Sequence, residues 1–431
     1  MSRAGGAVHL MGNLAPLLSG LITAPLTARA LGAVGRGEIT LLITVSTILI
    51  TVGTFGLGWL VRDAVAHDPF SVDYWRRKAR LLAVGLLPVA IVIALIMANW
   101  LRLTQWETIV TCVFYGIGAF AGTRSVEGSA LVSLGKTTAL GFANVSYATL
   151  VVGMTVGLFF MGALDVANLI IANALGVSVQ MFVLWVVMRR TRRGSLTALA
   201  QRTIELRRDP AHSTRQVLKR AGVAWRTQLV DAASLRADTL LLGGSATRQV
   251  VGLYSVVALL PQMAFAVYLT LVQRSFARSP GLAPEVRLRV LMQGCMITGI
   301  VGCMIGIPLA YVGIPWLFGP DFTAARQYLL PGGLMMLGLA ALTPVMVDLS
   351  RRPKSAVMLL LVFIPALVVG VLGFLMNPFL GITLLGLGYI VAGIAYSTSK
   401  LGLKLFAIDF PLIFIVFTGR RGQWGAGEVP A

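Results

Sequence analysis

Long apolar stretches recur along the whole chain, separated by short polar segments. Each holds about 20 residues, the length that an α-helix needs to cross a hydrocarbon layer of about 30 Å. The pattern predicts an all-α, polytopic membrane protein of about twelve transmembrane helices. The predicted spans are 7–28, 38–61, 81–98, 108–134, 138–160, 167–188, 222–243, 251–273, 290–313, 328–349, 356–376 and 382–399.

The two ends of the chain need separate interpretation. The first span is not expected to be a cleaved signal peptide, because its flank carries only Arg3 and no small-x-small cleavage site precedes a soluble domain. Near the other end, "LFAIDFPLIFIVFTG" (405–419) is short for a span and contains Asp409 and Pro411. We interpret this stretch as an interfacial segment rather than a thirteenth helix.

The longest polar segment divides the predicted spans into six and six. Residues 189–221 carry ten basic residues and the periodicity of a surface helix, so they are interpreted as a cytoplasmic linker. A shorter segment, "SVDYWRRKAR" (71–80), also has the Trp-plus-basic character of a membrane-surface element. The predicted domains are an N-terminal six-helix lobe at 1–188, the linker at 189–221, a C-terminal six-helix lobe at 222–399, and an interfacial segment with a cytoplasmic tail at 400–431.

The two predicted lobes share a weak internal similarity. The stretch "ARALGAVGRGEITLLITVSTIL" (28–49) aligns with "TLLLGGSATRQVVGLYSVVALL" (239–260). Both pass from a helix end through Leu-Gly and a short Arg-containing loop into another apolar helix. Because each lobe has an even number of spans, equivalent helices would point the same way, as in transporters with parallel repeats. This predicts two pseudo-symmetric lobes.

Composition and charge placement agree with this membrane assignment. The chain is 57% hydrophobic and 12% charged, whereas soluble domains carry roughly 25% charged residues. The formal net charge is +20. Of the 36 lysines and arginines, 28 fall in segments on the same side as the N-terminus and 5 on the opposite side. The positive-inside rule then places both termini on the cytoplasmic side. The expected location is the bacterial cytoplasmic (inner) membrane. The charge suits anionic lipids, and nucleic acid is not an expected partner.

One motif suggests nucleotide binding at first sight. In "ALVSLGKTT" (130–138), Ala130, Gly135, Lys136 and Thr137 fit a relaxed phosphate-binding-loop pattern. A true loop of this kind follows a buried strand and opens a helix in a soluble domain. Here the motif follows a predicted membrane helix, so we interpret it as a turn between two spans. Nucleotide is therefore not an expected ligand.

No pattern in the sequence predicts an enzyme or a cofactor. Three cysteines, an odd number, all lie in apolar spans, which favours neither a disulfide framework nor a metal site. They are Cys112, Cys295 and Cys303. The three histidines are scattered and form no H-E-x-x-H arrangement. We therefore expect no catalytic residues, no metal and no cofactor.

Ionisable residues inside membrane spans are the strongest functional candidates, because burying them unpaired is costly. In span seven, helical geometry places Gln228, Asp231 and Asp238 on one stripe, which we expect to face a water-filled cavity. Arg236 lies on a flank of that stripe and Arg226 nearer the cytoplasmic end. Arg226, Arg236 and Asp238 can also be interpreted as end-of-helix or snorkelling groups, whereas a purely structural role fits mid-span Asp231 poorly.

Span four and the first outer loop supply the other charged candidates. Arg124 and Glu127 are three residues apart, so they either form an ion pair on one helix or line a cavity. Arg29 and Arg36 flank the outer loop and are outer-gate candidates that could receive a phosphate or anchor lipid headgroups. Uncharged polar residues within spans are interpreted mainly as contacts between helices. These are Asn144, Asn173, Gln180 and Gln262.

Three segments in register resemble a known family. The stretch "ARALGAVGRGEITLLI" (28–43) is similar to the R-x-L-G-x-x-x-x-G element after the first helix of polysaccharide exporters. The stretch "LRADTLLLGG…VGLYSVVALLP" (235–261) resembles their seventh-helix signature. The stretch "LFGPDFTAARQYLLPGGLMMLG" (317–338) is similar to the segment before their tenth helix. With the twelve spans, the chain resembles the oligosaccharide-lipid flippases of the multidrug/oligosaccharidyl-lipid/polysaccharide (MOP) exporter superfamily.

This resemblance implies two lobes around a central cationic cavity and alternating access that moves a polyprenyl-pyrophosphate-linked oligosaccharide to the outer leaflet. By position, it assigns pyrophosphate binding to Arg124, Arg226 and Arg236. The polysaccharide polymerase machinery is an implied partner. Two departures stand against a peptidoglycan-precursor flippase: the first helix lacks an internal Arg, and the two extra helices expected of that subgroup are absent.

Other functions stay open at this stage. A cation-coupled multidrug or lipid exporter of the same superfamily usually needs buried acids in its first lobe, where only Glu127 qualifies. A membrane-embedded enzyme acting on polyprenyl substrates would need a catalytic loop with clustered acids or a metal site. For energy, the sequence leaves both membrane potential and ion coupling at Asp231 or Glu127 open.

Overall fold

The computed structural model describes most of the chain, and its regular structure is helical. The described residues are 3–54, 56–58, 61, 65, 68–85, 87–134, 136–192, 205, 214–278, 283–350 and 355–405. No strand occurs among them. They form two compact units, Met1–Val256 with Gly313–Ala325, and Val257–Val312 with Arg326–Ala431.

The first helix of unit 1 contains a sharp break. Helix α1 is assigned to Arg3–Thr54, but the dihedral angles of Gly32 (φ 64°, ψ −174°) are not helical. Arg36 donates a hydrogen bond to Thr27, which nine residues of straight helix would hold about 13 Å away. A single glycine at positive φ therefore turns the chain where the sequence predicts a loop over residues 29–37.

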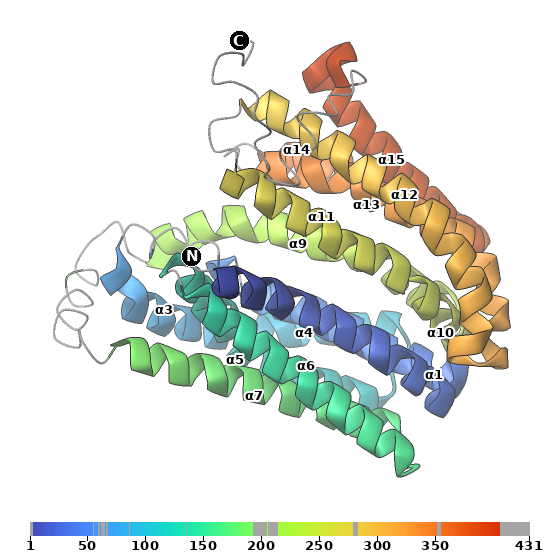
Figure 1. The fold of residues 1–431 in the computed structure, drawn as a ribbon, viewed down its shortest axis with the longest axis horizontal. Helices are drawn as coiled ribbons and strands as arrows, with labels where there is room; N and C mark the ends of the chain where they lie inside the picture. The colour runs from blue at the N-terminus through green and yellow to red at the C-terminus, as the bar shows by residue number, and fades with distance from the viewer. Residues whose placement is uncertain are drawn as a thin grey trace. The chain divides into compact units, whose positions relative to one another are not determined.

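The remaining helices of unit 1 pack around α1 (Figure 1). Helices α5, α6 and α7 lie beside α1 and each other, and α9 also packs against α1. In chain order the elements are η1 (Pro69–Ser71), α3 (Val72–Gly85), α4 (Leu87–Trp100), α5 (Gln105–Ser133), α6 (Thr137–Phe160), α7 (Val166–Arg192), α9 (Thr214–Ser245) and α10 (Arg248–Val257).

Helix α3 shows that the basic segment 71–80 is more than a surface element. Its residues Tyr74 and Trp75 are 4% exposed and join a hydrophobic core with Leu131 and Leu184, from α5 and α7. Arg77, on the other hand, is exposed. Trp75, which suggested a membrane-surface element, is thus a core residue, and α3 packs against α5.

Unit 2 is built around helix α13, which packs against α11 and α15. Gly338 and Gly386 let α13 and α15 approach so closely that a Cβ on either glycine would meet the backbone of the other helix. The elements are α11 (Leu259–Arg278), α12 (Pro284–Phe318), η3 (Pro320–Tyr328), α13 (Leu329–Ser350), α14 (Ser355–Met376), α15 (Pro378–Leu401) and η4 (Gly402–Leu405). Residues 313–325, at the end of α12 and in η3, belong to unit 1.

The helices coincide closely with the predicted spans. For example, predicted span 138–160 is α6 (Thr137–Phe160), and predicted span 251–273 is the pair α10 and α11, bent by 43°. Six described helices are long and apolar enough to cross a membrane, and the bent pair taken as one span makes a seventh. The chain is therefore an all-helical, multi-pass membrane protein, whereas twelve crossings remain a prediction.

Three further predictions have three different outcomes. The stretch 130–138 runs from the end of α5 into α6 with Lys136 exposed, so no strand precedes it and the turn interpretation is confirmed. Most of the predicted linker and the segment 406–431 lie outside the described residues. Helix α9 and most of α10, predicted for the second lobe, group with unit 1, while the proposed lobe division itself remains a prediction.

Candidate functional site

Two glycines bring helices α1 and α10 into backbone contact. A Cβ on Gly37 would collide with the Arg248 carbonyl, and a Cβ on Gly252 with the Ala33 carbonyl. These glycines belong to the two segments, 28–49 and 239–260, that carry the internal sequence similarity. The crossing fixes the polar residues beside it: Arg36 and Glu38 on α1, and Arg248 and Ser255 on α10. Together with Arg102, Glu107, Asp238 and Tyr254, we call these residues the polar cluster of unit 1.

Arg36 is held in this cluster by hydroxyl groups. Its Nη1 donates to Thr27 Oγ1 at 2.6 Å, and its Nε donates to Ser255 Oγ at 3.3 Å. Thr27 and Ser255 are buried, whereas Arg36 is half-buried. No carboxylate forms an ion pair with Arg36 among the described residues. The guanidinium is oriented by neutral groups, so its charge is not neutralised.

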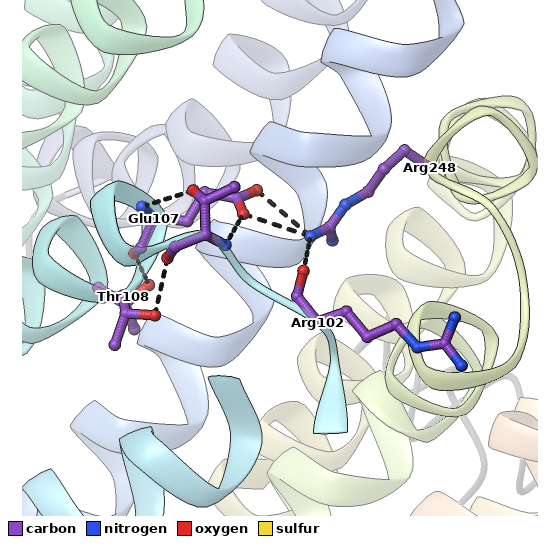
Figure 2. A network of polar contacts seen from close by, with 6 residues as sticks. Arg102, Glu107, Thr108 and Arg248 are labelled. Atoms are coloured by element: carbon purple, nitrogen blue, oxygen red, sulfur yellow. Dashed lines mark hydrogen bonds and ion pairs between the residues drawn. The ribbon is translucent and has the colours of Figure 1, made fainter. Parts of the chain in front are cut away.

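A second arginine of the cluster joins α10 to α5 (Figure 2). Arg248 Nη2 lies 3.4 Å from both oxygens of Glu107 and donates to the Arg102 carbonyl at 3.3 Å. Glu107 is 4% exposed and also forms a capping box with Thr104 at the start of α5. One nitrogen thus serves three acceptors at distances longer than a typical hydrogen bond. The Arg248 Nη1 is buried and has no hydrogen-bond partner among the described residues.

Arg102 has an unusual backbone conformation at this contact. Among the described residues, Arg102 is the one residue other than glycine that has a positive φ (52°). It follows the end of α4, a position where glycine is usual. Its side chain is exposed, and only its carbonyl takes part in the Arg248 network (Figure 2). The strained residue therefore presents its carbonyl to Arg248.

Replacing Arg102 by glycine should stabilise the protein by about 1 kcal/mol, because the left-handed conformation costs a non-glycine residue roughly 1–2 kcal/mol. The measurement is the denaturant midpoint of the purified protein in detergent. Arg102→Ala is the matched control, since it removes the same side chain but keeps the Cβ. Equal midpoints for the glycine and alanine variants would contradict this explanation.

Asp238 is the best-satisfied carboxylate of the cluster. It is 3% exposed and accepts hydrogen bonds from Tyr254 Oη at 2.5 Å and from the Thr239 backbone N–H at 2.6 Å. Tyr254 is fully buried on α10. Asp238 thus joins α9 to α10, which is a structural role that the sequence could not distinguish from a position facing a cavity.

Glu127 has a partner that the sequence did not suggest. Its Oε1 accepts hydrogen bonds from Nε, at 3.0 Å, and Nη2 of Arg76 on α3. Both side chains are buried, at 8% exposure for Arg76 and 5% for Glu127. The Arg124 side chain lies outside the described residues, so both roles considered for it, an ion pair with Glu127 or the lining of a cavity, remain predictions.

Arg29 contacts the end of a helix far along the chain. It donates to the carbonyls of Trp316, at 2.6 Å, and Leu317, at 2.9 Å, in the last turn of α12. These carbonyls have no partner within their own helix, and a cation is favourable at a helix C-terminus. The contact holds the end of α12 to α1, and the outer-gate role of Arg29 remains a prediction.

The other predicted site residues are dispersed along α9. Arg226 is exposed in the first half of the helix, whereas Gln228 and Arg236 are half-buried. The side chain of Asp231 lies outside the described residues, so the predicted polar stripe is described only in part. The polar contacts between helices are confirmed for α6 and α7: Gln180 donates to Asn144 at 2.5 Å, and Tyr147 donates to Asn173 at 3.3 Å.

Four charged residues of unit 1 were not selected from the sequence. Arg76, Glu107 and Arg248 fall in predicted loops, where a charge is usually solvated. A signal for Glu107 exists in the T-x-x-E capping-box pattern of "TQWE" (104–107). Glu38 follows Gly37 at the start of span two, and it is half-buried with no hydrogen bond or ion pair among the described residues.

This helical arrangement is the fold of MATE transporters of the MOP superfamily. A multidrug resistance MATE family transporter in an inward-facing conformation superposes with a TM-score of 0.64 at 13% identity, covering 94% of this chain and 98% of that one. A point mutant of the Vibrio cholerae MATE transporter VcmN gives 0.60 at 16% identity, covering 95% and 97%. A MATE protein in the straight conformation gives 0.59 at 13% identity, covering 94% and 96%.

Comparisons by sequence add no relative. No family model matches the chain. No curated protein matches it either. The similarity to MATE transporters is therefore one of fold, and it agrees with the membrane architecture predicted from the apolar pattern.

Proposed function

We propose that this chain is a transporter that moves a polyprenyl-pyrophosphate-linked oligosaccharide from the cytoplasmic to the outer leaflet by alternating access. Its fold is one used by membrane transporters. The substrate class is favoured by one observation on charge. The buried carboxylates Glu107, Glu127 and Asp238 already have partners, whereas the Arg36 guanidinium contacts only hydroxyl groups. Such an arrangement suits an anionic substrate better than a cationic one.

Arginine is well suited to this substrate. Its planar guanidinium binds phosphate oxygens through two parallel hydrogen bonds and stays charged when buried. Arg36 and the half-buried Arg236 are the described candidates on α1 and α9, and Arg124 and Arg226 keep the role implied by their positions. Anionic lipids and the polysaccharide polymerase machinery remain proposed partners of this activity.

Deleting the gene in its bacterium should trap the lipid-linked oligosaccharide on the cytoplasmic face of the membrane. The measurement is the share of this intermediate that an externally added, membrane-impermeant glycan-modifying enzyme can reach. Complementation by the wild type should restore access, whereas Arg236→Ala should restore little. Arg77→Gln, which removes an exposed charge on α3, is the control and should restore access fully. Normal access in the deletion strain would refute the proposal.

A cation-coupled multidrug exporter is the second candidate function. The structural neighbours include a multidrug resistance transporter, and Glu38 offers a half-buried carboxylate that has no hydrogen bond or ion pair among the described residues. The same deletion strain distinguishes the two functions. Accumulation of a cationic dye that the wild-type gene reverses and Glu38→Gln does not, together with unchanged oligosaccharide access, would favour drug export.

A further inference from the structure

We propose that Arg36, Thr27 and Ser255 form a binding subsite for a phosphate-class oxyanion, namely the phosphate or pyrophosphate group of a lipid. This inference names the chemical group recognised at one place in the polar cluster. Its role in transport rests on the proposed function, whereas the binding itself does not. The subsite joins the two halves of α1 to α10.

The two hydroxyl groups orient the arginine without competing for an anion. Thr27 Oγ1 donates its own hydrogen to the Ala24 carbonyl at 3.0 Å, and Ser255 Oγ donates to the Gly252 carbonyl at 2.7 Å. With their hydrogens so engaged, both oxygens act as acceptors for Arg36. A guanidinium carries more N–H donors than these two oxygens occupy, so the rest are left for another acceptor.

The arginine side chain is held by rigid backbone. The break at Gly32 turns α1 so that Thr27 reaches Arg36, and the crossing of Gly37 and Gly252 sets Ser255 against it. Because the fork is pre-oriented, little side-chain freedom is lost when a ligand binds. This is the arrangement expected of a binding group rather than of a mobile surface arginine.

The nearby carboxylates do not neutralise this charge. Glu107 is bound to Arg248, and Asp238 to Tyr254 and Thr239. Glu38 is two residues from Arg36, so helical geometry directs it about 200° around α1. The half-buried Arg36 residue thus carries an unpaired charge, which a phosphate oxygen can satisfy.

The phosphate could belong to the transported carrier lipid or to a resident anionic lipid, and the experiment separates these sources. The full-length protein is purified in an uncharged maltoside detergent, which contains no phosphate. Inorganic pyrophosphate is titrated at constant ionic strength, and binding is followed by the rise in the thermal unfolding midpoint. A second titration is made in micelles that also contain phosphatidylglycerol.

We expect pyrophosphate to raise the midpoint of the wild type. Arg36→Gln should weaken the apparent affinity about ten- to a hundredfold, as expected for the loss of charged hydrogen bonds. Arg36→Lys keeps the charge but loses the fork, so it should bind with an intermediate affinity. Arg77→Gln removes an exposed charge on α3 and should bind as the wild type does. If Arg36→Gln fails to fold, Ser255→Ala should still weaken binding several-fold, about three- to tenfold.

Wild-type affinity in both Arg36→Gln and Ser255→Ala would overturn the subsite. Competition by phosphatidylglycerol in the wild type that Arg36→Gln abolishes would support the subsite and identify a resident lipid as a source. Pyrophosphate binding that depends on Arg36 without such competition would support it and point to the carrier lipid. If pyrophosphate binding depends on Arg36 but the deletion strain shows normal oligosaccharide access, only the proposed function is contradicted. If the deletion strain traps the oligosaccharide but pyrophosphate binding does not depend on Arg36, only the subsite is contradicted.

Discussion

Replacing Glu127 by alanine should destabilise the protein by about 3–5 kcal/mol, because the change leaves the buried charge of Arg76 without its partner. Arg76 is buried and joins α3 to α5 through this carboxylate. The other nearby carboxylate, Asp73, is 3.9 Å away from Arg76, which is too far for a hydrogen bond. The measurement is the free energy of unfolding in detergent, from denaturant titration.

The matched control replaces both partners, as Arg76→Leu with Glu127→Leu. Removing a buried ion pair as a whole is often neutral or even stabilising, because neither charge then has to be buried. The double variant should therefore be much closer to the wild type than Glu127→Ala is. If the double variant lost at least as much stability as the single one, α3 would be held to α5 by something other than this pair.

Replacing Gly252 by alanine should be at least as damaging, with a loss of about 3 kcal/mol or more. The added methyl group would overlap the Ala33 carbonyl, and backbone cannot rotate away as a side chain can. Helices α1 and α10 would have to separate, which also removes Ser255 from Arg36. Yield of monodisperse protein and the unfolding midpoint both report this effect.

Gly157→Ala provides the comparison for this glycine. Gly157 is an exposed position on α6, and a Cβ there would meet no atom within 4 Å. Alanine is a better helix former than glycine by about 1 kcal/mol, so this variant should be neutral or slightly stabilised. Equal losses at Gly157 and Gly252 would mean that the crossing with α1 does not constrain the latter.

The helices could be predicted from the sequence, but most of the charge partners could not. Apolar side chains facing lipid must continue for the length of a span, so a stretch such as 138–160 identifies α6 almost to the residue. Partners depend on which helices touch. Arg76 and Glu127 are 51 residues apart, and Arg36 and Ser255 are 219 apart. Helical spacing can pair only near neighbours, which is why it suggested Arg124 for Glu127.

The contact between α1 and α10 at Gly37 and Gly252 could be predicted only in part. The similarity between segments 28–49 and 239–260 identified two elements of interest, but it could not show that they touch. Glycines are frequent in membrane helices, and nothing in the local sequence distinguishes Gly252 from the unconstrained Gly157. The difference exists only once α1 and α10 are placed side by side, within the same compact unit.

Unit 1 consists of two separate stretches of the chain, and this affects when it can fold during synthesis. The unit needs residues 313–325, yet residues 257–312, which belong to unit 2, leave the ribosome first. Arg29 is therefore synthesised about 290 residues before the α12 carbonyls that it binds. Domains generally fold as units during synthesis, so a ribosome-bound chain ending at 256 should resist protease less than one extended past 325. Separately expressed halves cut at residue 256 should likewise become stable only when made together.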